Sequence, residues 1–216
     1  MADTSASTGS LADLSCRDFA CELAARKSVP GGGGAAALAG ALGIALCSMV
    51  GSFTAGKKRY AEVEEDVCRM MGEAEELRSK LVGLIQADAV AFEPLSRAYS
   101  IPRDDPARAQ ELEAATKKAC SAPMEMMRAC ARSVELLEEM GEKGSRMLLS
   151  DIGCGAALCS AALMSASLNV FVNTKALADR AYAESLEQEA DQLLATYAPR
   201  ADALASLVAR RIRGEE

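Results

Sequence analysis

Histidine and tryptophan are both absent from this chain of 216 residues, and aromatic residues make up only 4% of it. Without histidine, proton transfer near neutral pH must use a carboxylate, lysine, cysteine, tyrosine or water. Mixed cysteine–histidine metal sites are excluded, and the eight cysteines form no Cys-x-x-Cys pair, so we expect no metal site. The cysteines are instead expected to be buried free thiols in a reducing cytoplasm.

An overall excess of positive charge is also lacking, since the formal net charge is −7. This charge argues against non-specific nucleic-acid binding, which requires a basic surface. The cluster Lys57, Lys58 and Arg59 is a local exception, and it is able to attract an anionic small molecule at short range. The alternative interpretation is a solvated, basic start of a helix.

The scarcity of aromatic residues implies a core of alanine, leucine, valine and methionine, which mostly favour helices. No stretch shows sustained strand-like alternation. We therefore predict an all-α fold, a single-domain bundle of long helices over residues 11–216. A small, polar leader at residues 1–10 is expected to be disordered. The predicted helices cover residues 15–27, 35–52, 60–100, 104–140 with an interruption at Pro123, 150–173, and 175–213 with a kink or break at Pro199.

Two stretches without charge, residues 28–56 and 152–174, are each long enough to span a bilayer. Alanine, glycine, serine and cysteine dominate both, and no tryptophan is available for an interfacial belt. We therefore expect two central helices of a soluble protein, with no membrane partner and no signal peptide, in the cytoplasm. Small residues recur at steps of four in both stretches, which favours close packing of the two helices. These residues are Ala39, Gly43, Cys47 and Gly51, and Gly153, Ala157, Ala161, Ser165, Asn169 and Asn173.

Four consecutive glycines, Gly31 to Gly34, follow Pro30 and precede the first uncharged helix. Neither a P-loop nor a dinucleotide-binding fingerprint matches them. One interpretation is a flexible hinge. The other is close approach of the backbone to a ligand, with unpaired N–H groups of the helix start available to an anion.

Two carboxylates lie outside the acidic runs. Asp88 lies in an apolar segment, where burial would raise its pKa toward that of a general acid or base; a solvated position on the outer helix face is the alternative. Asp151 opens the second uncharged helix, which favours a role as an N-cap or first-turn residue. The amides Asn169 and Asn173 lie one turn apart on that helix. They satisfy each other, a backbone carbonyl, or the polar edge of a ligand.

The run Ser-Val-Pro-Gly-Gly-Gly-Gly-Ala-Ala-Ala-Leu-Ala-Gly-Ala-Leu-Gly and the later Gly-Lys-Lys-Arg-Tyr resemble the opening signature of the cyclodeaminase/cyclohydrolase family of folate enzymes. Asp-Ala-Val-Ala-Phe at residues 88–92 resembles a segment lining that family's active site, and Ser150-Asp151 also matches. The family usually has serine where this chain has Gly34.

The resemblance implies a tetrahydrofolate derivative as substrate, no tightly bound cofactor, and a homodimer. It makes Asp88, Lys57 and Asp151 candidate catalytic residues. The implied substrate-binding residues are Pro30, Gly31, Gly32, Gly33, Gly34, Lys58, Arg59, Asn169 and Asn173. We expect the glycines and the basic cluster to form one site.

The expected activity is that of a 5,10-methenyltetrahydrofolate cyclohydrolase, which forms 10-formyltetrahydrofolate. The alternative is a formiminotetrahydrofolate cyclodeaminase, which closes the same ring and releases ammonia. Both reactions pass through a tetrahedral centre at the same carbon, so one site is able to serve either. A second alternative, from a different class, is a non-catalytic helical interaction module.

Overall fold

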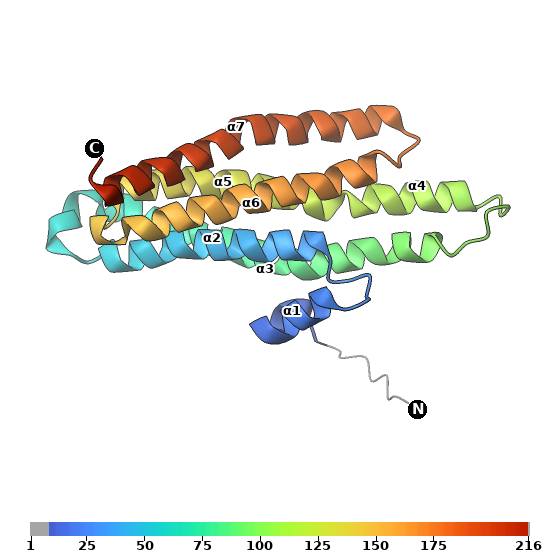
Figure 1. Cartoon of the computed structure of the whole chain (residues 1–216), viewed down its shortest axis with the longest axis horizontal. Coiled ribbons are helices and arrows are strands. Elements are labelled where there is room, and N and C mark those ends of the chain that lie inside the picture. The colour runs from blue at the N-terminus through green and yellow to red at the C-terminus, as the bar shows by residue number, and fades with distance from the viewer. Residues whose placement is uncertain (1–8, 216) are drawn as a thin grey trace.

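Long helices lie side by side along the longest axis of the molecule (Figure 1). The computed structural model describes residues 9–215, and this part of the chain contains no strand. The elements are η1 (Leu11–Asp13), α1 (Cys16–Ala24), α2 (Gly32–Thr54), η2 (Lys58–Val63), α3 (Glu64–Ala98), α4 (Arg108–Ala119), α5 (Ser121–Lys143), η3 (Arg146–Leu148), α6 (Leu149–Thr174) and α7 (Arg180–Arg213). The all-α prediction is confirmed. Residues 1–8 of the leader predicted at residues 1–10 lie outside the described residues, whereas Gly9 and Ser10 are described and Ser10 caps η1.

Several predicted boundaries were wrong by a few residues. The first uncharged helix begins at Gly32 instead of residue 35, so three of the four glycines are helical. The interruption predicted at Pro123 falls at Cys120, because proline is tolerated in the first turn of α5. Pro94 and Pro199 lie inside α3 and α7 without ending either helix.

Helices α2 and α6 pack closely, as the two rows of small residues predicted, and they run in opposite directions. A Cβ atom added at Gly43 of α2 would lie 2.6 Å from the Cys159 sulfur and 3.0 Å from the Gly155 carbonyl oxygen of α6. Gly32, at the start of α2, lies beside Asn169, near the end of α6. Only helices with very small side chains at the crossing can approach this closely.

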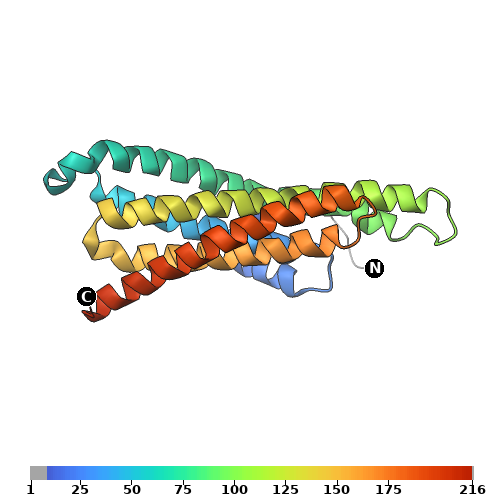
Figure 2. The ribbon, with the colours of Figure 1, turned by 90° about the horizontal axis from the view of Figure 1, so that it is seen from above.

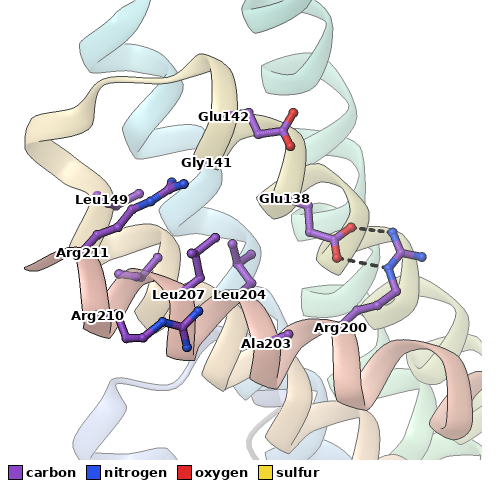
Figure 3. A pocket seen from close by; sticks show the side chains of 11 residues that line it. Glu138, Gly141, Glu142, Leu149, Arg200, Ala203, Leu204, Leu207, Arg210 and Arg211 are labelled. Carbon is purple, nitrogen blue, oxygen red and sulfur yellow. Dashed lines mark hydrogen bonds and ion pairs between the residues drawn. The ribbon is translucent and has the colours of Figure 1, made fainter. Parts of the chain in front are cut away.

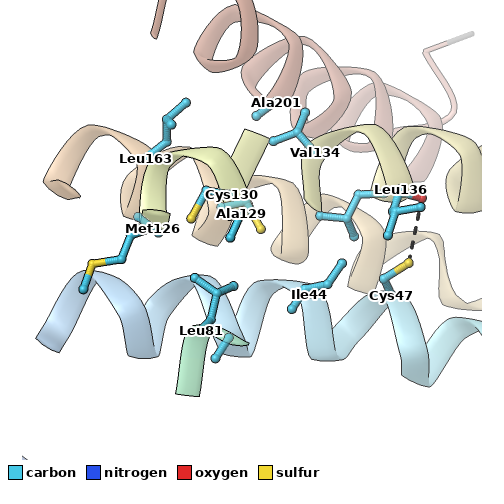
Figure 4. Close-up of a cluster of buried hydrophobic side chains, with 14 of the residues drawn as sticks. Ile44, Cys47, Leu81, Met126, Ala129, Cys130, Val134, Leu136, Leu163 and Ala201 are labelled. Atoms are coloured by element: carbon cyan, nitrogen blue, oxygen red, sulfur yellow. Dashed lines mark hydrogen bonds between the residues drawn. The ribbon is translucent and has the colours of Figure 1, made fainter. Parts of the chain in front are cut away.

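Helix α5 covers one side of this central pair and contacts α2, α3, α6 and α7. Its inner side chains, including Met126, Cys130 and Leu136, meet Ile44 and Cys47 of α2 in the core (Figure 4). Burial raises the pKa of the Cys47 thiol to about 12, so this thiol stays protonated. The prediction of buried cysteines holds for only four of the eight; Cys16, Cys21, Cys68 and Cys154 are exposed.

The outer surface of α5 is joined to its neighbours by ion pairs. Arg69 of α3 pairs with Glu139 of α5, and Arg128 of α5 pairs with Glu189 of α7. Arg200 of α7 donates to Glu138 of α5. Figure 2 shows α5 running along the length of the bundle beside α7. Charge therefore concentrates on the side of the bundle that α5 occupies.

The opposite side of α2 and α6 is uncharged, and no element within residues 9–215 covers it; we call it the α2/α6 face. It comprises outward-facing residues of both helices: Ala35, Ala39, Leu42 and Phe53 of α2, and Cys154, Ala157, Ala161, Met164, Leu168 and Val172 of α6. Leu168 is 68% exposed and Val172 64%. The two central helices are therefore exposed on this side. By length and composition alone α2 and α6 could cross a membrane, although this test also selects core helices of soluble proteins.

Candidate functional site

The first turn of α2 is the centre of the candidate site. Gly31 is its N-cap, with extended backbone and no side-chain hydrogen bond to the helix. None of the four glycines has a positive φ, so backbone freedom is not the reason that glycine occurs here. Gly32, Gly33 and Gly34 are therefore helical in this structure instead of forming a loop or hinge.

Contact with Asp88 of α3 explains one of the glycines. A Cβ atom at Gly33 would lie 2.5 Å from both carboxylate oxygens of Asp88, so no larger residue fits without moving that side chain. At Gly34 the nearest atoms, from Pro30, Ile85 and Phe19, would be 3.5–3.8 Å away, which is ordinary contact. The strict steric requirement within the run therefore belongs to Gly33.

Asp88 is half-buried and accepts a hydrogen bond from the backbone N–H of Gly34. It thereby caps α2 from a neighbouring helix, in place of the side chain that Gly31 lacks. Burial raises the pKa of Asp88 above its ordinary value, and the Gly34 hydrogen bond opposes this only in part. The carboxyl group is thus held in a fixed position and kept easier to protonate than a solvated aspartate.

Asn169 of α6 lies on the other side of the same turn. A Cβ atom at Gly32 would be 3.5 Å from its Nδ2 and 3.6 Å from its Oδ1. Nδ2 donates to the Ser165 carbonyl at 2.9 Å. Beside it a groove of about 400 Å³ opens on the α2/α6 face, within the size range of small-molecule sites. Its walls are mostly small side chains, from Gly32, Ala35, Ala36, Ala39, Ala161, Ser165, Leu168 and Asn169.

Asn173 takes no part in this groove. Its Nδ2 donates to the carbonyl of Ala119 at 3.1 Å, which ties the end of α6 to the end of α4. Of the alternatives open for the two amides, each is therefore bonded to a backbone carbonyl, and the pair does not satisfy itself.

The basic cluster lies at the other end of α2. Helix α2 has 23 residues, with the glycines at its start and the cluster just beyond its end, and at a rise of about 1.5 Å per residue its length is roughly 35 Å. Lys57 lies over the ring of Phe53, with its Nζ 5.8 Å from the ring centre. Asp151, in the first turn of α6, belongs to the same end, since Thr54 accepts a hydrogen bond from the backbone of Ser145 just before α6. The prediction of one site from glycines and basic cluster is wrong within a single chain.

Reasoning from the sequence missed Ser165 and Leu168 as groove residues. Ser165 belongs to the row of small residues spaced four apart in the second uncharged helix. Only the packing of α6 against α2 shows which residues of that helix stay open to the groove. A second cavity of about 480 Å³ lies between α5, α6 and α7 (Figure 3). It contains none of the predicted site residues, and its Glu138 is paired with Arg200. Among residues 9–215 no cluster of cysteine, aspartate and glutamate could hold a metal ion.

Comparison with known proteins is consistent across sequence and structure. The family model described as formiminotransferase-cyclodeaminase matches residues 15–192. A methenyltetrahydrofolate cyclohydrolase of Methylorubrum extorquens is 43% identical over 177 residues, which cover 80% of this chain and 85% of that protein. A formimidoyltransferase-cyclodeaminase of Mus musculus is 31% identical over 86% of this chain, and the match spans only 35% of that protein. The crystal structure of a formiminotetrahydrofolate cyclodeaminase from Thermotoga maritima superposes with a TM-score of 0.80 at 32% identity, covering 91% of this chain and 98% of that one.

Proposed function

Because the chain belongs to the formiminotransferase-cyclodeaminase family, we propose that it hydrolyses 5,10-methenyltetrahydrofolate to 10-formyltetrahydrofolate. The similarity to the Methylorubrum cyclohydrolase, which extends over most of both proteins, favours this reaction. The observation that carries the proposal is the half-buried carboxyl group of Asp88, fixed against Gly33 in the first turn of α2, the same turn whose Gly32 lines a groove of suitable size.

In this reaction water adds to the electrophilic carbon that bridges N5 and N10 of the substrate. Asp88 accepts the proton of the attacking water and returns it to N5 as the C–N5 bond of the tetrahedral adduct breaks, while the adduct's hydroxyl proton passes to solvent as the formyl C=O forms. The raised pKa of Asp88 suits both proton transfers. The carboxylate is a stronger base than that of an ordinary aspartate, and its protonated form is also more accessible as a proton donor. The negative carboxylate also stabilises the cationic amidine of the bound substrate.

The rest of the candidate site binds and orients the folate. The groove walls are small and uncharged, which suits a flat ring system. The amide of Asn169 and the backbone of Pro30 to Gly34 supply polar groups at the groove end. No redox change occurs in the reaction, so water and side chains suffice and we propose no tightly bound cofactor.

The second candidate reaction is the cyclodeaminase reaction on 5-formiminotetrahydrofolate. It is favoured by the name of the Thermotoga protein, which aligns along nearly its whole length. N10 attacks the formimino carbon, and the tetrahedral adduct then expels ammonia. Asp88 would take the proton from N10 and give it to the leaving nitrogen, so the same carboxyl group serves.

We also propose a soluble, cytoplasmic homodimer that pairs through the α2/α6 face and binds neither nucleic acid nor membrane. The face is about 35 Å long and about 20 Å wide, if helices pack about 10 Å apart. This corresponds to roughly 700 Å² per protomer, close to the ~800 Å² of a standard-size interface. An exposed apolar surface of this size is unusual for a monomer.

Two spectrophotometric assays on one preparation test the proposed activity. The first follows loss of methenyltetrahydrofolate, and the second follows its formation from formiminotetrahydrofolate with release of ammonia. We expect turnover in the first assay that exceeds the spontaneous rate. Turnover in the second assay alone selects the cyclodeaminase, and inactivity of the folded protein in both favours the non-catalytic interaction module.

A further inference from the structure

The C-terminal half of α7 diverges from α5, and a wedge-shaped space opens between these two helices over α6 (Figure 2). The ion pair between Arg200 and Glu138 holds the middle of α7 against α5. Further along, α7 packs on α6 instead, since a Cβ atom at Gly153 of α6 would lie 2.8 Å from the Val208 side chain of α7. We call the space that the three helices enclose the α5/α7 wedge.

Two adjoining cavities, of about 480 and 470 Å³, occupy the α5/α7 wedge. They share Gly141, Leu149 and Arg211 among their lining residues, so they are parts of one space. Its inner wall is apolar, and Leu204 and Leu207 point into it from α7 (Figure 3). A space of this size and lining is able to hold the hydrocarbon part of a small molecule away from water.

The wedge also has a charged rim. Its charged lining residues are four arginines and two glutamates: Arg146, Arg200, Arg210, Arg211, Glu138 and Glu142. One of the glutamates, Glu138, is bonded to Arg200 at the narrow end of the wedge. Arginines thus outnumber carboxylates here, although the chain as a whole has a formal net charge of −7. The rim is therefore more favourable to an anion than the average surface of this protein.

The helix dipole explains only part of this cluster of arginines. Arg210 and Arg211 lie in the last turn of α7, where basic side chains stabilise a helix end. Arg146 lies just before α6, where a cation opposes the dipole of that helix. It nevertheless lines the same cavity as Arg211. Guanidinium groups from the ends of two different helices, placed around one opening, suit the recognition of a carboxylate.

We propose that the α5/α7 wedge binds an organic carboxylate that carries an apolar acyl or aryl body. The body packs against Leu204 and Leu207, and the carboxylate accepts hydrogen bonds from Arg146 and Arg211 at the opening. The wedge lies on the α5 side of the bundle, away from the α2/α6 face and from the groove beside Asn169. It is therefore a second ligand site, and it would bind its ligand even in a protein that is inactive on folates.

Calorimetric titration of the full chain with octanoate tests the site, because octanoate combines a carboxylate with an acyl body. We expect saturable binding with a stoichiometry of about one octanoate per chain. Acetate lacks the apolar body and 1-octanol lacks the charge, so each should bind at least about tenfold more weakly. Non-saturable uptake of octanoate, or equal binding of 1-octanol, would overturn the proposal.

Substitutions at the rim and in the apolar part of the wedge locate the bound octanoate. Ala203→Phe places a phenyl group in the first cavity and should weaken binding at least about tenfold, because the added ring occupies the space of the ligand. Ala195→Phe, on the exposed side of the same helix, is its control and should bind octanoate like the wild type.

Arg211→Ala should also weaken octanoate binding about tenfold, through loss of a charge-assisted hydrogen bond. Arg213→Ala is its control, because Arg213 pairs with Glu215 and lines neither cavity. Thermal melts followed by circular dichroism show that each variant is folded. If Ala203→Phe and Arg211→Ala both bind octanoate as tightly as their controls, the ligand does not occupy the wedge and the proposal is wrong.

Leu168→Glu distinguishes the wedge from the groove on the α2/α6 face. Leu168 lines that groove, and a glutamate there would repel a carboxylate held in it. Because Leu168 is absent from the lining of the wedge, we expect this variant to bind octanoate with unchanged affinity. Loss of binding in Leu168→Glu, with binding retained in Ala203→Phe, would place the ligand in the groove and overturn the proposal.

Discussion

Replacing Gly33 by alanine should inactivate the protein through Asp88. The new Cβ would lie 2.5 Å from both carboxylate oxygens, closer than side-chain atoms ever approach. Because the backbone of α2 is fixed by its packing on α6, the Asp88 side chain must rotate away. It then loses its hydrogen bond with the Gly34 N–H and leaves its place against the first turn of α2.

Two effects of opposite sign determine the stability of Gly33→Ala. Loss of a hydrogen bond to a charged group costs about 1.5–3 kcal/mol. Alanine in place of glycine inside a helix contributes about 1 kcal/mol in the other direction. We therefore expect the free energy of unfolding to fall by roughly 0.5–2 kcal/mol. Turnover should fall on the order of a hundredfold or more, because the proton acceptor is displaced.

Gly83→Ala is the matched control. Gly83 lies in α3, the same helix as Asp88, and a Cβ there would meet nothing within 4 Å. This variant should gain up to about 1 kcal/mol of stability and keep wild-type activity. Urea denaturation and the methenyltetrahydrofolate assay measure both quantities. If Gly33→Ala behaves like Gly83→Ala in both, the Gly33–Asp88 contact does not have the role assigned to it.

Three further substitutions test other parts of the argument. Asp88→Asn should cut turnover at least about a hundredfold. It should be no less stable than the wild type at neutral pH, because burial disfavours the charged carboxylate; as the pH falls through the raised pKa toward 3.8, the wild type gains stability and the difference between the two proteins shrinks. Urea denaturation across a pH series measures this, and a variant less stable than the wild type at pH 7 would contradict it. Lys57→Ala should raise KM more than it lowers kcat, and substrate binding by this variant should depend less on salt than binding by the wild type does. A fall in kcat at constant KM would argue against a role of Lys57 in binding. Leu168→Glu should give a monomer in light scattering at micromolar concentration, whereas Ala195→Glu, on the exposed side of α7, should remain a dimer; a dimeric Leu168→Glu would exclude this face as the interface.

The sequence predicted the helical fold and the packing of its two central helices well, because both depend on local properties. Periodic small residues and the absence of charge are visible along a single segment. Asp88 was also identifiable, as a carboxylate in an apolar segment. Its partner was not, because the contact between Asp88 and Gly33 joins residues 55 positions apart in sequence.

Proximity in sequence led to the wrong prediction that the glycines and the lysines form one site within a chain. Residues 31–34 and 57–59 are close in sequence, but the segment between them is a straight helix instead of a loop. Residues that flank a continuous helix lie one full helix length apart in space. Which residues form the exposed α2/α6 face was not predictable for a similar reason, since uncharged residues on a helix do not indicate whether a neighbour covers them.

The attachment of α1 has a consequence for access to the site. Only Phe19 of this helix is buried, and its ring lies 3.8 Å from where a Cβ of Gly34 would be. Burial of one such side chain is worth only about 1.5–3 kcal/mol. In Figure 1, α1 stands apart from the long helices. By contrast, α5 has thirteen buried residues and neighbours on several sides.

Backbone amides should therefore exchange with deuterated solvent at very different rates in these two helices. The amides of α1 should exchange through local opening within seconds to minutes, whereas those at the centre of α5 should exchange only when the whole bundle unfolds. Local detachment of α1 would uncover Gly34 and the neighbouring carboxyl group while the remaining helices stay folded. This helix thus supplies a route by which solvent and small molecules reach the start of α2 without disturbance of the core.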